Sequence, residues 1–291
     1  MLTKIINVQD IAQTIENTIY HKLLKKNIKP HLLSIMIGDN PASQIYVSNK
    51  AKKCQMLNIR NTIINLDKDV SCETSLEIIQ KANQDDDIDG ILLQAPLPPH
   101  LNFNQIISYI NPTKDIDGLH PLNYGYLSLE KNLGDINTQN KYKGFVPCTP
   151  LGCINILKSV EPNLSGKKAV VIGRSILVGL PMLQLLINND CTTTLCHSFT
   201  KNLKEITQNA DIIISAVGNP KFLTSDFIKK DSIIIDVGIS RLKDSNGNSK
   251  IVGDVDLENV IDKAKHITKV PGGVGKTTIA CLMYNVSKKF I

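Results

Sequence analysis

The stretch AVVIGRSILVGLPM, at residues 169–182, decides the fold class of this chain. Its apolar start predicts a buried strand, Gly173 marks a tight turn, and the apolar residues after Gly179 predict a helix. A strand–turn–helix of this kind directs backbone N–H groups and the positive end of the helix dipole toward a pyrophosphate. The glycine spacing is G-x5-G rather than G-x-G-x-x-G. Spacing alone therefore leaves a plain strand–helix connection open beside a dinucleotide site.

Strands and helices alternate on both sides of this stretch, which indicates an α/β protein with parallel sheets. Downstream, helices are expected to begin near Val178, Lys201 and Thr224, with strands at 168–173, 192–197, 211–216, 232–237 and 267–270, and a helical segment at 277–289. Upstream, strands are expected at 31–38, 59–66 and 88–93, with helices at 41–57 and 73–83. Asn40 is the expected N-cap of the helix that starts at Pro41. Residues 96–147 predict loops and one short helix leading to a domain boundary.

Composition limits the class of protein. Hydrophobic residues make up 42% and charged residues 21%, which is typical of a globular protein, and 291 residues are enough for two ordinary domains or one large one. No apolar run approaches the ~20 residues that cross a bilayer, and the start MLTKIINVQD lacks a signal-peptide pattern. We therefore expect no membrane partner and a cytoplasmic location. The net charge of +6 suits solvated lysines and anionic small molecules, and the lack of Trp or a binding module argues against nucleic acid.

The cysteines point to free thiols. There are seven, an odd number, and none forms a C-x-x-C pair. Zinc sites and disulfide frameworks need tighter or better paired patterns. We expect reduced cysteines and no metal site.

The loop after the second downstream strand bears on the choice of cofactor. NAD-binding folds place an acidic residue there, about 20 residues after the glycine turn, to hold the ribose 2′-hydroxyl. The stretch HSFTK at 197–201 has no carboxylate, and Arg174 can instead meet a 2′-phosphate. The charges therefore favour NADP over NAD.

A second group of polar residues lies on the helix that begins at Pro41. Ser43, Tyr46 and Lys50 fall at i, i+3 and i+7, so they share one helix face. The Tyr ring offers a stacking surface, and a desolvated Lys can act as an acid or a base. Spacing alone favours a plainer interpretation, a surface helix with a solvated Lys and a half-buried Tyr.

Two further segments place polar groups near strand ends. Gln94 follows a buried strand, at the end of a parallel sheet where ligands bind, and its amide can bond a carbonyl or a developing charge. Asp115 and Asp117 lie in the loop KDIDGLHP, where one carboxylate can bind the amino-amide edge of a heterocycle. The alternative for these two is an Asx-turn. We interpret His120, before a proline in the same loop, as structural.

Together these segments resemble the methylenetetrahydrofolate dehydrogenase/cyclohydrolase family. The matching stretches are GDNPASQIYVSNK (38–50), DGILLQAPLP (89–98), KDIDGLHPLNYG (114–125), PCTP (147–150), GRSILVGLP (173–181) and PGGVG (271–275). They follow the family's order over nearly the whole chain. The resemblance implies two α/β domains flanking a cleft: a folate-binding domain at 1–140, completed by a helix at 275–291, and a Rossmann-like NADP-binding domain at 141–274. It also implies a homodimer.

The resemblance further implies residue roles. Tyr46 stacks on the pterin, Lys50 is the acid/base, Gln94 supports Lys50 and Asp117 anchors the pterin; these four are the expected catalytic residues. The expected folate contacts are Ser43, Tyr46, Asp117, Pro271, Gly272 and Gly273. The expected NADP contacts are Gly173, Arg174, Ser175, Val178, Gly179, His197, Ser198 and Ile239.

The implied chemistry has two steps. Hydride passes from methylenetetrahydrofolate to the nicotinamide, and water then opens the methenyl product to formyltetrahydrofolate, with Lys50 moving the protons. Holding the two rings face to face is the main requirement of the first step. The chain departs from the family's usual sequence at Ala95, where Leu is usual, and at Lys276-Thr277, where Pro-Met is usual. We expect the departure at Lys276-Thr277 to affect substrate affinity and the balance of the two activities.

Three other interpretations were weighed. PGGVGKTT resembles a P-loop, but Val270 stands where a strict motif needs Gly, and one helix of chain is all that follows. Tyr46-x3-Lys50 resembles the short-chain dehydrogenases, but the glycine turn comes after the pair here rather than before it. A non-catalytic folate- or nucleotide-binding regulator predicts binding without turnover, and the intact set of polar residues argues against it.

Overall fold

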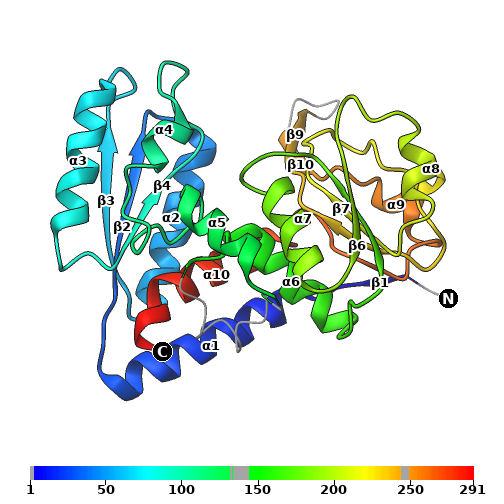
Figure 1. Cartoon of the computed structure of the whole chain (residues 1–291), viewed down its shortest axis with the longest axis horizontal. Coiled ribbons are helices and arrows are strands. Elements are labelled where there is room, and N and C mark those ends of the chain that lie inside the picture. The colour runs from blue at the N-terminus through cyan, green and yellow to red at the C-terminus, as the bar shows by residue number, and fades with distance from the viewer. Residues whose placement is uncertain (1–2, 132, 134–143, 244–248) are drawn as a thin grey trace. The chain divides into compact units, whose positions relative to one another are not determined.

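The computed structural model describes residues 3–131, 133, 144–243 and 249–291, which fall into two compact units (Figure 1). The small-sheet unit comprises Thr14–Tyr126, Tyr142–Cys148 and Ile279–Ile291. The large-sheet unit comprises Met1–Gln13, Leu127–Lys141 and Thr149–Thr278.

The small-sheet unit is built on a parallel sheet of three strands in the order β3-β2-β4. The strands are β2 (His31–Ile37), β3 (Arg60–Leu66) and β4 (Gly90–Leu93). The helices with most or all of their residues in this unit are α1 (Val8–Lys26), α2 (Pro41–Met56), α3 (Cys72–Gln84), α4 (Phe103–Ile107), α5 (Pro121–Leu129) and α10 (Gly275–Ser287), with the 3-10 turn η3 (Lys288–Phe290) at the end. Alternate residues of β2 pack with α3 and α4 in one apolar cluster, so these two helices cover one face of the sheet (Figure 1).

Local sequence explains the start of α2, the helix that carries the expected catalytic lysine. The side chain of Asn40 accepts a hydrogen bond from Ser43 N at 3.3 Å, and Pro41 occupies the first helical position, where its missing N–H costs nothing. The expected N-cap is therefore confirmed. The helix is positioned directly after β2, whose residues are buried almost throughout.

The large-sheet unit holds six strands in the order β1-β11-β8-β7-β5-β6, and every neighbouring pair runs parallel. The strands are β1 (Lys4–Ile5), β5 (Lys168–Ile172), β6 (Thr192–Cys196), β7 (Ile212–Ser215), β8 (Ile233–Asp236) and β11 (His266–Ile267). The other elements are α6 (Cys148–Val160), α7 (Gly179–Asn188), α8 (Leu203–Thr207), η2 (Ser225–Phe227), α9 (Leu257–Val260) and an antiparallel hairpin of β9 (Ser240–Lys243) and β10 (Ser249–Val252).

The order of the strands locates the ligand-binding edge of this sheet. From β5 the chain moves to β6 on one side and then to β7 on the other. The strand order therefore reverses beside β5, and doubly wound sheets bind ligands beyond the carboxyl ends of the strands at such a point. The turn after β5 is the G-x5-G turn that the sequence singled out.

The structure differs from the sequence-based expectation in two places, and a third expectation cannot be compared. β1 pairs with β11, so the start of the chain groups with the large sheet, whereas the expected folate domain runs over 1–140. The expected boundary at residue 140 lies outside the described residues. The helix expected near Thr224 is a three-residue 3-10 turn, η2. Over the described part of the chain, no helix has the length and apolar character that a membrane crossing requires.

Candidate active site and cofactor-binding turn

Lys50 and Gln94 form a hydrogen-bonded pair in the small-sheet unit. Lys50 lies on α2 and is only 9% exposed, and its Nζ donates to Gln94 Oε1 at 2.9 Å. Gln94 directly follows β4, and its backbone N donates to Ile35 O on β2 at 2.8 Å. The interpretation of Lys50 as a solvated surface residue is therefore wrong. The pairing of β2 with β4 sets the position of the glutamine that meets this lysine.

The Gln94 amide is held in one orientation. Its Nε2 donates to Ala95 O at 2.6 Å, so its Oε1 is left facing Lys50. Ser43 is buried on the same face of α2, and its Oγ also donates to Ala95 O, at 3.4 Å. Tyr46 lies between Ser43 and Lys50 in sequence and is half-buried. Burial raises the pKa of its hydroxyl, so the phenol stays protonated. The Ala95 carbonyl thus joins Ser43 and Gln94, and Gln94 Oε1 joins Lys50 to them.

Burial is the main influence on the Lys50 amine. It lowers the pKa of Lys50, because the charged form loses its hydration, while nearby Asp117, Cys148 and Cys54 act in the opposite direction. Burial also raises the pKa of Cys54 to about 12 and raises the pKa of Cys148 well above its ordinary value. Both thiols are therefore neutral near pH 7. Of these neighbours, Asp117 is the one that carries negative charge toward the lysine.

The structure separates the roles of the two aspartates that the sequence left open. Asp115 has no exposed surface, and its Oδ2 accepts from His120 N at 2.7 Å and from Asn123 Nδ2 at 2.8 Å. Burial raises the pKa of Asp115 to about 6. Asp117 is partly exposed. Asp115 therefore holds the loop together, and Asp117 is the carboxylate available to a ligand.

His120 is a structural residue of the same loop. Its Nε2 lies 3.1 Å from Ser108 O, and its Nδ1 accepts from Leu122 N at 3.0 Å. Both ring nitrogens are thus engaged by the backbone. The structural interpretation of His120 is confirmed.

The glycine turn of the large-sheet unit leaves no room for side chains. Gly173 has a φ of +115°, and a Cβ there would lie 2.4 Å from Ala216 O. A Cβ on Gly179 would lie 2.0 Å from Gly173 O. Ser175 Oγ accepts from Val178 N at 3.2 Å just before α7 begins. The turn is therefore compact and ends at the N-terminus of a ten-residue helix, which suits a pyrophosphate.

The loop after β6 lies beside this turn. The loop closes through His197 N donating to Thr200 Oγ1 and Thr200 N donating to His197 O, both at 2.8 Å. The guanidinium of Arg174 lies 5.9 Å from the centre of the Phe199 ring in this loop. Arg174 is exposed, and so is Ser198. The loop has no carboxylate at the place where a NAD-binding fold has one, and a cation from the glycine turn lies beside it, so the residues present fit the 2′-phosphate of NADP.

Phe199 is a residue of this loop that the sequence did not single out. Its side chain is 78% exposed, and its ring meets His197 edge-on at 6.1 Å between centres. An exposed aromatic residue between Arg174 and His197 offers a flat surface at the expected cofactor site. The sequence feature that could have identified Phe199 is an aromatic residue in a polar turn, since only 4% of the residues in this chain are aromatic.

The remaining expected contacts also lie in the large-sheet unit. Ile239 is 49% exposed and follows β8, at the ligand-binding edge of the sheet. Pro271 is exposed, Gly272 is partly exposed, and Gly273 is buried with its Cα against the Lys269 carbonyl. Each set of residues is thus grouped within its own unit: Ser43, Tyr46, Lys50, Gln94 and Asp117 in the small-sheet unit, and the turn, Ile239 and the PGG segment in the large-sheet unit.

The P-loop interpretation of PGGVGKTT finds no support in the geometry. A P-loop presents the hydroxyl that follows its lysine to a magnesium ion. Here Thr277 is fully buried, and its Oγ1 donates to Val274 O at 2.9 Å. Among the described residues, every strand of the sheet precedes the loop in sequence, whereas a P-loop is followed by a strand that carries a magnesium-binding carboxylate. In the described portion, no group of three or more His, Cys, Asp or Glu is arranged to hold a metal ion.

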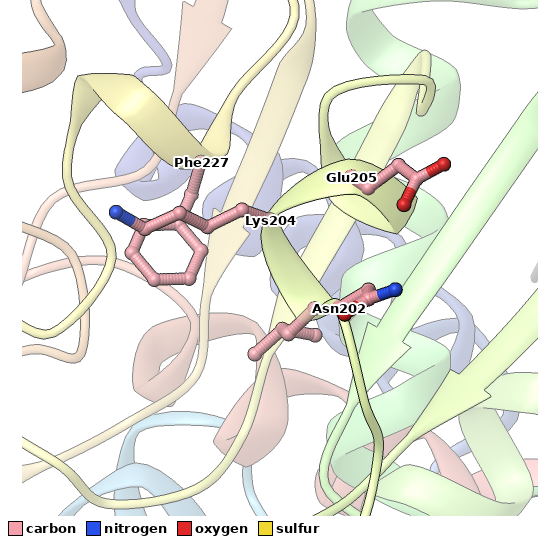
Figure 2. Close-up of a pocket in the computed structure, with 5 residues that line it drawn as sticks. Asn202, Lys204, Glu205 and Phe227 are labelled. Atoms are coloured by element: carbon pink, nitrogen blue, oxygen red, sulfur yellow. The ribbon is translucent and has the colours of Figure 1, made fainter.

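A surface hollow near α8 is not part of either group. It is lined by Asn202, Leu203, Lys204, Glu205 and Phe227 (Figure 2). Lys204 is already engaged, because it pairs with Asp226 and its Nζ lies 5.0 Å from the centre of the Phe227 ring. None of the expected site residues lines this hollow.

A doubly wound parallel sheet with a compact glycine turn, together with a buried lysine–glutamine pair on a second α/β unit, defines a two-domain NAD(P)-dependent enzyme. Comparison with protein-family models makes the assignment specific. The model described as the tetrahydrofolate dehydrogenase/cyclohydrolase catalytic domain matches residues 6–117, and that of the NAD(P)-binding domain matches residues 147–291. The chain belongs to the tetrahydrofolate dehydrogenase/cyclohydrolase family.

Individual relatives agree with this assignment. The bifunctional protein FolD of Rickettsia bellii is 44% identical over 99% of both chains. The solved structure of FolD methylenetetrahydrofolate dehydrogenase/cyclohydrolase from Campylobacter jejuni is 41% identical, with a TM-score of 0.89 over 99% of both chains. The structure of the Trypanosoma brucei enzyme, complexed with NADP cofactor and an inhibitor, is 31% identical, with a TM-score of 0.90 over 100% of this chain and 98% of that one.

These findings test the expectations drawn from the sequence. The family, the two-domain α/β class, the paired dehydrogenase and cyclohydrolase activities and the NADP cofactor are confirmed. The roles assigned to individual residues and the domain boundaries stay predictions.

Proposed function

We propose that Lys50 is the acid/base of a bifunctional enzyme. The enzyme oxidises 5,10-methylenetetrahydrofolate with NADP and hydrolyses the 5,10-methenyl product to 10-formyltetrahydrofolate, in one-carbon metabolism. The observation that carries this proposal is the buried Lys50 Nζ, held 2.9 Å from Gln94 Oε1 and with a lowered pKa. Such an amine reaches its neutral form more readily than an exposed lysine and can take a proton from water.

The small-sheet unit provides the groups for the folate. The half-buried Tyr46 ring supplies a surface on which the pterin stacks, and the partly exposed Asp117 carboxylate accepts from the amino-amide edge of the ring. Ser43 and Gln94 are fixed by the Ala95 carbonyl, so they hold their positions before the substrate arrives. Preorganised groups of this kind lose little freedom on binding.

NADP, when bound, accepts a hydride from the methylene carbon of the folate. In the second step the Lys50 amine removes a proton from water as its oxygen bonds to the methenyl carbon. The bond from that carbon to the pterin ring nitrogen then breaks as the new hydroxyl becomes the formyl carbonyl and releases its proton to solvent, and the Lys50 ammonium returns a proton to the nitrogen. Gln94 Oε1 keeps Nζ in place through both transfers, because the other end of its amide is tied to Ala95 O.

The proposed function is tested by mixing the protein with methylenetetrahydrofolate and NADP. We expect NADPH to form without accumulation of the methenyl intermediate, since the cyclohydrolase step consumes it. The measurement is the absorbance of NADPH and of the methenyl product over time. If no NADPH forms with either NADP or NAD, the dehydrogenase assignment fails.

We propose that Arg174 selects NADP by binding its 2′-phosphate. Replacing Arg174 with Ala removes a charge-assisted hydrogen bond worth about 1.5–3 kcal/mol. We expect the KM for NADP to rise roughly 10- to 150-fold while the KM for NAD stays the same. Arg60→Ala is the matched control, because Arg60 is an exposed arginine of the small-sheet unit that pairs with Asp87. Equal changes for NADP and NAD would mean that Arg174 does not recognise the 2′-phosphate.

We further propose that the protein is a homodimer. β3 is one of the two edge strands of the small sheet in the described structure, and a free edge offers backbone groups to a second chain. Ile63 on this strand is exposed, as are Ile45 and Met56 on α2, which packs beside it. Light scattering on the full chain is expected to give twice the monomer mass of 32.1 kDa.

The cellular location and the domain boundaries are proposals of the same kind. A cytoplasmic location is supported by the cysteines, because all seven lie in the described part of the chain and none forms a disulfide, as in reducing compartments. We propose a folate-binding domain at 1–140 with 275–291 and an NADP-binding domain at 141–274. The division between residues 117 and 147 is supported by the two family models at 6–117 and 147–291, and the assignment of the last helix by the grouping of Ile279–Ile291 with the small-sheet unit.

A further inference from the structure

Two buried aspartates lie beyond the carboxyl ends of β7 and β8. Asp236 ends β8, and Asp254 follows β10; they are 2% and 0% exposed. Asp236 Oδ1 accepts from Gly238 N at 3.1 Å and from Asp254 N at 3.0 Å, and its Oδ2 accepts from Val255 N at 3.0 Å. Asp236 thereby fixes the backbone that carries Asp254.

Asp254 in turn fixes the loop after β7. Its Oδ2 accepts from Ser215 Oγ at 3.0 Å and from Val217 N at 2.9 Å. Its Oδ1 is packed against Gly238 of the loop after β8: a Cβ on that glycine would lie 2.0 Å from it. A single carboxylate therefore sets the positions of both loops. The two loops are also tied directly, because Ser240 Oγ donates to Gly218 O at 3.1 Å.

These loops form one wall of the proposed cofactor site. The loop after β7 carries the Ala216 carbonyl, against which the Cα of Gly173 is packed so closely that a Cβ would come within 2.4 Å. The loop after β8 carries Ile239, an expected NADP contact that is half-exposed. A shift of either loop would therefore displace groups on which NADP is expected to rest.

We infer that Asp254 is a positioning residue for NADP, which acts by holding the loops after β7 and β8 and not by touching the cofactor. The inference rests on the proposed roles of Gly173 and Ile239. Asp254 has no exposed surface, so contact with a ligand is excluded in this conformation. The geometry also requires a carboxylate, because two donors converge on Oδ2 while Oδ1 has no hydrogen-bond partner among the described residues.

Asparagine cannot replace this carboxylate without a cost. With its oxygen toward Val217 N, the amide NH2 is buried against Gly238 with no acceptor. With the amide turned round, the NH2 faces the Val217 N–H, and two donors meet. Either arrangement disturbs one of the two loops.

The test uses the full chain with Asp254→Asn. We expect the Kd for NADPH, measured by its fluorescence, and the KM for NADP to rise roughly 5- to 100-fold. We expect kcat at saturating NADP to fall less than threefold, because a loss of binding alone raises KM and leaves kcat nearly unchanged. Hydrolysis of methenyltetrahydrofolate supplied directly is expected to stay within twofold of wild type, because that reaction does not use NADP. This second activity serves as an internal control for folding.

Two further variants complete the test. Ser215→Ala removes one of the two donors to Asp254 and is expected to weaken NADPH binding in the same direction but less. Asp256→Asn is the matched control, since Asp256 pairs with Lys221 at the surface and is expected to leave the Kd unchanged. Ser215→Ala decides the question if Asp254→Asn does not fold.

An unchanged Kd for NADPH in Asp254→Asn, or in Ser215→Ala if the first variant does not fold, overturns the inference. So does an equal loss of NADPH binding and of methenyltetrahydrofolate hydrolysis, because that pattern indicates general destabilisation. Failure of the wild-type protein to bind NADPH is a different result, which removes the proposed cofactor site itself.

Discussion

Replacing Lys50 with Met is expected to remove the cyclohydrolase activity while NADPH formation remains measurable. A positioned acid/base contributes roughly 10²- to 10⁴-fold to a rate, so a loss of that size is expected in the hydrolysis of methenyltetrahydrofolate. Met fits the apolar, buried path of the lysine side chain, which is 9% exposed, so the fold is expected to persist. The methenyl intermediate should therefore accumulate when the variant is given methylenetetrahydrofolate and NADP.

The matched control for this variant is Lys53→Met. Lys53 lies on the same helix, but it pairs with Glu16 at 2.7 Å instead of with Gln94. We expect both activities to stay close to those of the wild-type protein. Retention of more than a tenth of the cyclohydrolase rate in Lys50→Met would show that another group moves the protons.

The pH profile of the cyclohydrolase step gives a second test of Lys50. A base acts in its deprotonated form, so the rate is expected to rise with pH through the Lys50 pKa and then level off. Burial lowers that pKa, so the rise occurs at lower pH than for an exposed lysine. Asp117 opposes the shift, so Asp117→Asn is expected to move the rise to still lower pH at saturating substrate. A rise that does not move contradicts the coupling between the two residues.

Gly179→Ala is expected to remove NADP-dependent dehydrogenation. The added Cβ would lie 2.0 Å from Gly173 O, a backbone atom that cannot turn aside, so the turn between them must open. A displacement of about 1 Å can cost roughly 10²-fold, and we expect at least that loss in NADPH affinity. The measurements are the Kd for NADPH and the KM for NADP, with methenyltetrahydrofolate hydrolysis as the activity that should persist.

Gly125→Ala is the matched control for this change. Gly125 lies at an exposed position inside α5, and no atom lies within 4 Å of the place its Cβ would occupy. Alanine is the better helix former by about 0.5–1 kcal/mol, so this variant is expected to be slightly more stable and fully active. Wild-type affinity for NADPH in Gly179→Ala would mean that the turn can open without loss of the cofactor site.

Strong local patterns in the sequence were enough to predict much of the fold. The strand and helix around Gly173 were predictable because a short apolar run, a glycine and an apolar helix follow one another directly. α2 was predictable from Asn40 and Pro41, which fix its start. By contrast α1, with 19 residues, was missed among polar residues, although its buried positions follow a helical spacing: Val8, Ala12, Ile15, Ile19 and Leu23.

The candidate site was predictable only where its residues are close in sequence. The common face of Ser43, Tyr46 and Lys50 follows from helical spacing, but the contact between Lys50 and Gln94 depends on how β2 pairs with β4. The choice between Asp115 and Asp117 depends on burial, which spacing does not determine. The same holds for Asp254, because its partners come from loops at distant points in the chain.

The parallel pairing of β1 with β11 has a consequence for synthesis on the ribosome. Lys4 lies opposite His266, so β1 has no pairing partner until residues 266–267 have been synthesised. The small-sheet unit also lacks part of its core until α10 has been synthesised, because Asn285 on α10 donates to Ile116 O and Val146 O. Neither unit can complete its core before these late residues have been synthesised, and the long closures involved slow assembly. Until then the strand edges that β11 and α10 stabilise are exposed to wrong pairing.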